Sequence, residues 1–153
     1  MAWLDSRARF DPDAFTAPVI GIAATLGNHD SGLHQHQRGQ LLFTRQGCMR
    51  ITLAQQLCLL PPSRAAWIPS GVRHRAVMQQ SVDYRSIYLT PALCTELPQH
   101  VCVMEVSALL HAVLEPMALC DFDTDWQQGK FFHLLGLCLG EIRDAAQQPM
   151  LLP

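Results

Sequence analysis

The sequence predicts a mainly β domain, with antiparallel strands in a barrel or sandwich, followed by a C-terminal helical segment. Residues 17–90 form short apolar runs separated by Gly, Pro, Asn and Asp, which is typical of short strands joined by turns. After Pro91 the apolar residues recur every three or four positions, as on one face of a helix. With 153 residues, of which 49% are hydrophobic and 16% charged, the chain can bury one core.

The expected strands lie in the first two thirds of the chain. A strand at 18–24 precedes a turn-rich loop at 27–32. Met49, Ile51 and Leu53 alternate with polar or small neighbours, as in a half-buried strand. The other expected strands are residues 40–44, 57–60, 65–68, 75–78 and 84–89.

Two helices are expected after the strands. The first carries an apolar stripe from Val106 to Met117, with Ser107 placed to begin it and Pro116 straining its last turn. The second covers 127–146 and is apolar over more than half of its circumference. Such a helix packs on two sides, so we expect one side against the barrel and the other in a homodimer. The second stripe contains Phe131, Leu134, Leu135, Cys138, Leu139 and Ile142, with Phe132 and Leu137 outside it.

Composition and charge exclude several classes of function. The net charge of −2 comes without a basic stripe, so we expect no nucleic-acid binding by this chain itself. The N-terminus lacks the apolar core of a secretory signal, and no run reaches the length of a membrane helix; we expect a cytoplasmic protein with no membrane partner. The six cysteines contain no C-x-x-C pair and are expected to be reduced core thiols.

Three histidines and a glutamine form the candidate site. His34 and His36 are two residues apart, so on a strand both side chains point to the same face, and Gln40 has the same parity. His74 follows a turn at 69–73 that brings it to the start of a strand. Three imidazoles and an amide oxygen suit a borderline divalent metal such as Ni, Zn, Fe or Co. The other four histidines, His29, His100, His111 and His133, are expected to be surface or hydrogen-bonded residues without a role in the site.

This spacing resembles the two motifs of the cupin superfamily, G-x5-H-x-H-x3-4-E-x6-G and G-x5-P-x-G-x2-H-x3-N, over residues 28–78. Asn28 and Ser63 stand where the motifs begin with glycine, and Met78 replaces the closing Asn. Gln40 replaces the usual Glu. Because an amide is neutral, it is a poorer metal ligand than a carboxylate and cannot serve as a base.

A narrower resemblance is to the N-terminal sensing domain of AraC-type transcriptional regulators. It is carried by residues 40–43, 47–51, 60–62, 65–69 and 71–74, and continues through 88–89 into the helices. The resemblance implies a cupin-like antiparallel β-barrel (a double-stranded β-helix) over residues 1–100 and a helical dimerisation segment packed on it over 101–148. It also implies the start of a linker at 149–153, leading to a DNA-binding domain with two helix-turn-helix motifs that this chain lacks.

The favoured function is therefore the effector- or metal-sensing and dimerisation domain of a bacterial transcription regulator, with DNA contacted only through the missing domain and no catalytic residue. One alternative is a metal-dependent cupin enzyme of the dioxygenase or isomerase type; another is a metal-free binder of a sugar or other small molecule. Core packing is the alternative for Trp67, and Arg38 could pair with an anionic effector or face solvent. The expected ligand-binding residues are His34, His36, Gln40, Trp67 and His74, and all of these except Trp67 are the expected metal ligands.

Overall fold

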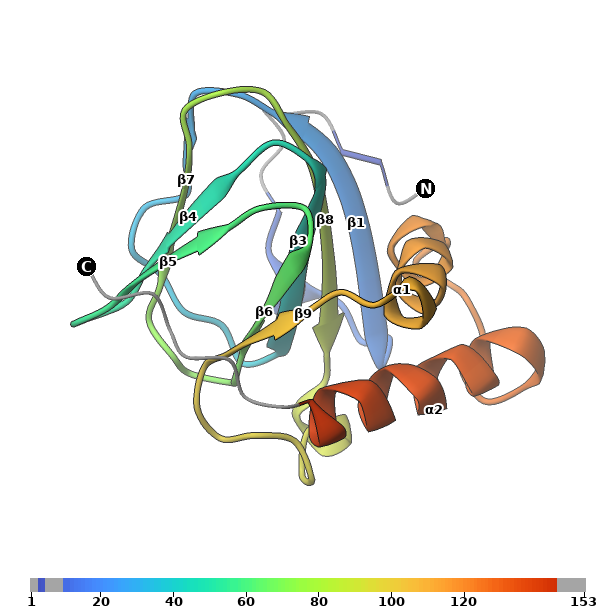
Figure 1. Cartoon of the computed structure of the whole chain (residues 1–153). Helices are drawn as coiled ribbons and strands as arrows, with labels where there is room; N and C mark the ends of the chain where they lie inside the picture. Colours follow the sequence, from blue (N-terminus) through green and yellow to red (C-terminus); the bar gives the residue numbers. More distant parts are fainter. Residues whose placement is uncertain (1–2, 5–9, 146–153) are drawn as a thin grey trace.

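The computed structural model describes residues 3–4 and 10–145, and consists of two antiparallel β-sheets with two helices beside the larger sheet (Figure 1). The five-stranded sheet has the order β1-β8-β3-β6-β9, and the four-stranded sheet the order β2-β7-β4-β5. This confirms the mainly β class with a C-terminal helical segment. The 3-10 turns are Pro12–Ala14 and Pro91–Leu93, and the helices are α1 (Ala108–Leu119) and α2 (Gly129–Asp144). The strands are β1 (Val19–Leu26), β2 (His29–Asp30), β3 (Gly39–Gln46), β4 (Met49–Thr52), β5 (Leu57–Leu60), β6 (Arg64–Ile68), β7 (Arg75–Met78), β8 (Val82–Leu89) and β9 (Cys102–Glu105).

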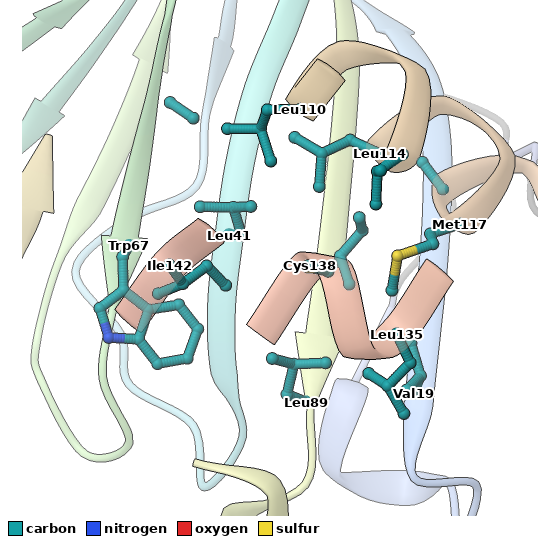
Figure 2. Packing of buried hydrophobic residues seen from close by; sticks show 14 of the residues in the cluster. Val19, Leu41, Trp67, Leu89, Leu110, Leu114, Met117, Leu135, Cys138 and Ile142 are labelled. Atoms are coloured by element: carbon teal, nitrogen blue, oxygen red, sulfur yellow. The ribbon is translucent and has the colours of Figure 1, made fainter. Parts of the chain in front are cut away.

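Alternation along the strands of the larger sheet divides the buried residues into two cores. On β3, Leu42 packs in the core between the two sheets, whereas Leu41 and Phe43 pack in the core under the helices. Successive side chains of a strand point to opposite faces, so both faces of this sheet are covered. Figure 2 shows the second core, in which residues of α1 and α2 meet outward-facing residues of β1, β3, β6 and β8.

The strand β9 extends the larger sheet beyond the boundary expected at residue 100. Residues 102–105 pair antiparallel with β6, with Ala66 opposite Val103. The barrel part of the fold thus continues to Glu105, and its outer core is shared with the helices. The expected linker at 149–153, and residues 146–148 of the expected helical segment, lie outside the described residues.

Helix α1 is fixed tightly against β1. The Ser107 hydroxyl caps it by accepting a hydrogen bond from the Leu110 amide, as expected. Pro116 lies inside the helix, three residues before its end at Leu119. On β1, a Cβ at Gly21 would stand 2.1 Å from the Met117 carbonyl oxygen, so the close approach of helix and strand requires glycine there.

Helix α2 buries one stripe and leaves large apolar side chains exposed. Leu135, Cys138 and Ile142 are buried against the sheet, as the sequence predicted. Phe132 and Leu137 lie off that stripe and are 52% and 46% exposed. None of the six cysteines forms a disulfide. Cys58, Cys102, Cys120 and Cys138 are buried, as expected for core thiols, whereas Cys48 is exposed, which corrects that expectation for this residue. Among the described residues, no helix is both long and apolar enough to span a membrane.

Candidate metal and effector site

The three histidines meet at one end of the space between the sheets. His34 and His74 face each other across an isolated antiparallel bridge, with each backbone N–H donating to the other's carbonyl at 2.9 Å. His36 follows two residues later in the same segment between β2 and β3, which lies outside the named strands. The available ligand nitrogens of the three side chains all lie within 4.8 Å of one another.

Each imidazole is oriented by a backbone carbonyl. The Nδ1 atoms of His34, His36 and His74 lie 2.9, 2.7 and 2.9 Å from the carbonyl oxygens of Gly32, Arg38 and Val72. A carbonyl oxygen only accepts hydrogen bonds, so each Nδ1 must carry the proton. The lone pair of the neutral ring is then on Nε2, which is the arrangement seen in metal-binding histidines.

His74 is the most buried of the three, at 2% exposed. Burial lowers the pKa of His74 to about 4, with the nearby His34 and His36 acting in the same direction against the hydrogen bond to Val72. A neutral His74 is the form that can ligate a metal, since the protonated ring has no lone pair to give.

Gln40 on β3 links the histidines to a cluster of hydroxyl groups. Its Oε1 lies 2.9 Å from Nε2 of His36. Its Nε2 donates toward the oxygens of Tyr84 (3.1 Å), Ser86 (2.7 Å) and Tyr88 (3.1 Å). These residues alternate along β8, and Tyr88 is directly opposite Gln40 in the strand register, so they share the inner face of the sheet. Burial raises the pKa of both tyrosines.

A cavity of about 440 Å³ lies beside these groups and is lined by Gln40, Tyr84 and Tyr88 as well as His34 and His74. At its rim, Asp30 accepts a two-pronged ion pair from Arg75, and this guanidinium holds the pKa of the carboxyl group well below its usual value. The volume falls within the range of small-molecule pockets in proteins. Its apolar walls include Ile22, Ala24, Leu26, Leu42, Ala76 and Met78.

Trp67 does not belong to this cavity, which corrects the expectation that it binds ligand. In the β3–β6 register Gln40 is opposite Ile68, whereas Trp67 is opposite Leu41 and therefore points to the helix side. There the ring is fully buried near Ile142 (Figure 2), and its Nε1 donates to the Pro98 carbonyl. Trp67 is therefore a core residue, which was the alternative expected from the sequence.

Arg38 also has a different role from either one expected. It is 5% exposed, so it does not face solvent, and it does not line the cavity. Its guanidinium donates to the carbonyl oxygens of Phe15, Ala17 and Pro18. These contacts hold the segment before β1 against the barrel and leave no free cation for an anionic effector.

The sequence reasoning missed the hydroxyl cluster. Tyr84, Ser86 and Tyr88 are spaced by two, which was a signal that they share one face of a strand. Nothing in the spacing says which face is inward, because that depends on the register with β3. The acidic rim residue Asp30 was likewise placed only in a turn-rich loop.

Comparisons with known proteins place the chain in a family. The AraC-like ligand binding domain model matches residues 16–130, and the chain belongs to this family. The HTH-type transcriptional regulator NimR of Escherichia coli (strain K12) is 26% identical over 111 residues, which are 71% of this chain and 40% of that protein. The chain therefore spans less than half the length of this relative. The resemblance to AraC-type regulators is confirmed, and these relatives support the expectation of a non-enzymatic domain.

The comparison with solved structures includes two cupins. An RmlC-like cupin from Shewanella frigidimarina has a TM-score of 0.45 and 14% identity, covering 49% of this chain and 68% of its own. A cupin-2 domain containing protein from the same species has a TM-score of 0.44 and 16% identity, covering 47% and 71%.

Proposed function

We propose that this chain is the effector-sensing domain of a transcription regulator, whose cavity binds a small molecule and whose DNA contacts belong to a separate domain. The observation that carries this is a cavity with apolar walls and a cluster of oriented polar groups at one end, in a chain of the AraC-like ligand-binding family. An effector acts by binding one conformation more tightly than another. The coding sequence downstream of Pro153 tests the regulatory part: a pair of helix-turn-helix motifs supports it, and a stop codon contradicts it.

We further propose that His34, His36, His74 and Gln40 hold one divalent cation, of the class Ni, Zn, Fe or Co. The fit rests on the three Nδ1–H donors, which leave three Nε2 lone pairs within a few ångströms of one another. Two acceptors, Nε2 of His36 and Oε1 of Gln40, face each other at 2.9 Å, and a cation held by both would satisfy the pair. When bound, such an ion would supply positive charge and open coordination positions to an effector.

Metal analysis of purified protein tests this site. The double variant His34→Ala and His74→Ala is expected to lose stoichiometric metal while remaining folded by circular dichroism. His133→Ala, which removes an exposed imidazole from α2, is the matched control and should retain the metal. One equivalent of metal retained by the double variant would place the binding site elsewhere.

We also propose that α2 forms a two-fold interface with a second copy of the chain. Its outward face carries Phe132 and Leu137 beside an apolar groove that Leu93 and Leu139 help to line. Exposed apolar surface of this kind is typical of association sites. Leu137→Glu should yield monomers in sedimentation, whereas Leu109→Glu, a change at an equally exposed leucine on α1, should not. A wild-type chain that stays monomeric at high concentration would refute the interface.

A further inference from the structure

Tyr84 and Tyr88 of the hydroxyl cluster on β8 line the cavity, and Ser86 is fully buried between them in the strand. The Gln40 amide N–H groups donate toward the oxygens of Tyr84, Ser86 and Tyr88, so the O–H protons of these hydroxyls are the donors that the cluster has left to offer. The acceptor atom of that amide, Oε1, is turned away toward His36. Because no carboxylate belongs to this cluster, it is best complemented by a ligand group that accepts hydrogen bonds.

Among the described residues, the same end of the cavity offers no lysine, arginine or unpaired carboxylate to a charged ligand, and its side chains that titrate near neutral pH are histidines. The carboxylate of Asp30 is at the rim, paired with Arg75. The buried Arg38 and Arg85 direct their guanidinium groups to backbone carbonyls and to carboxylates outside the cavity. A charged ligand would lose its hydration without gaining an opposite charge, so without a metal ion the pocket favours uncharged molecules.

The rest of the wall is hydrocarbon. Ile22, Leu26 and Leu42 come from the larger sheet and Met78 from the smaller one, so a ligand between the sheets meets apolar side chains on both sides. We propose that the hydroxyls of Tyr84 and Tyr88, held by Gln40 and with Ser86 behind them, form the recognition subsite for the effector, and that the effector is an uncharged small molecule with an apolar body and a carbonyl-type oxygen acceptor. This inference rests on the proposed effector-binding function and names its ligand class.

Four probes that share a benzene ring test this class: acetophenone, ethylbenzene, benzoate and benzylamine. Each is titrated into the whole chain after EDTA treatment, and binding is followed by amide chemical shifts of residues around the cavity. Acetophenone should bind at least about tenfold more tightly than the other three, since it alone is neutral and presents an acceptor. Benzoate or benzylamine binding as tightly as acetophenone would overturn the proposal.

Variants of the cluster test its residues. Tyr84→Phe and Tyr88→Phe each remove one hydroxyl but keep the ring, so the preference for acetophenone over ethylbenzene should fall several-fold while ethylbenzene binding persists. If a tyrosine variant fails to fold, Ser86→Ala is used instead: it removes a hydroxyl that accepts from Gln40 behind the two tyrosines, and it should also lower the preference. Ser81→Ala, which removes an exposed hydroxyl just before β8, is the control and should keep the preference. An undiminished preference in the cluster variants would overturn the assignment of these residues.

The outcomes separate this inference from the proposed function. Binding of ethylbenzene without a preference for acetophenone overturns the ligand class alone, because the cavity still takes a ligand. If the purified wild-type chain retains no metal but still prefers acetophenone to ethylbenzene, the metal part of the proposed function is contradicted and the subsite is supported. If none of the four probes binds, both the subsite and the effector pocket are contradicted.

Discussion

Arg85 on β8 donates from Nε to the carboxylate of Glu115 on α1 at 3.1 Å, and this ion pair joins the barrel to the helical segment. The Arg85 side chain is 2% exposed, also pairs with Asp83, and lies 4.7 Å from the centre of the Trp3 ring. Its neighbours Tyr84 and Ser86 belong to the hydroxyl cluster and point to the opposite face of the strand. One strand therefore contacts the cavity with one face and α1 with the other.

Glu115→Ala is expected to destabilise the chain. The substitution leaves the buried guanidinium of Arg85 with Asp83 as its remaining carboxylate, at a cost of roughly 2 kcal/mol in the free energy of unfolding. Urea unfolding followed by circular dichroism measures this. Glu96→Ala, at an acid whose side chain is 80% exposed, is the control and should change stability by less than about 0.5 kcal/mol. Equal changes in the free energy of unfolding for the two variants would mean that the ion pair between Arg85 and Glu115 adds no more stability than an exposed one.

Gly21→Ala is expected to separate α1 from β1. Its new methyl group would meet the Met117 carbonyl oxygen at 2.1 Å and Ala118 Cα at 2.8 Å, both of them backbone atoms that cannot rotate away. We expect a loss of about 3 kcal/mol or more of stability. Gly140→Ala on α2, where the nearest atom to the new methyl would be Arg143 Nη2 at 3.8 Å, should instead stabilise the helix by about 0.5–1 kcal/mol. Thermal unfolding of both variants tests the contrast in sign.

Much of the fold could be predicted because its signals are local. The alternation of Met49 and Ile51, the cap at Ser107 and the stripe through Cys138 each depend on neighbours within one element. The strands β2 and β9 were not predicted. The strand β2 has two residues, too few for a period to be recognised, and β9 lies in the part of the chain where the apolar spacing predicts helices. Both are strands because distant strands pair with them.

The site could be predicted in part for a similar reason. The pairing of His34 with His74 follows from a motif spacing, whereas the side of the sheet on which Trp67 lies follows from the register of β3 with β6. A shift of one residue in that register would exchange Trp67 and Ile68 between the two cores. The role of Arg38 could not be predicted either, because its acceptors are backbone carbonyls some twenty residues earlier.

Thiol reactivity should distinguish Cys48 from the other cysteines. Cys48 is exposed, whereas Cys58, Cys102, Cys120 and Cys138 are buried. Burial raises the pKa of Cys138 to about 12, and raises that of Cys58 as well, so these thiols stay protonated and unreactive near neutral pH. Iodoacetamide and mass spectrometry on the native chain should show Cys48 alkylated first, and Cys48→Ser should remove that fast phase. Rapid native labelling of Cys138 would show that α2 leaves the sheet.

Gln40→Glu tests whether the glutamine side chain contacts the metal ion. A carboxylate is the stronger ligand, so the dissociation constant for Ni²⁺ or Zn²⁺ should fall by roughly tenfold or more. Without metal, the new charge would be buried among neutral groups at a position that is 4% exposed, so the melting temperature should fall below that of the wild type. Adding metal should more than restore it, because binding to the folded state alone stabilises that state. Gln46→Glu, the same change at the exposed end of β3, should leave both quantities unchanged. If Gln40→Glu lowered the melting temperature without strengthening metal binding, Gln40 would be a neighbour of the histidines and not a ligand.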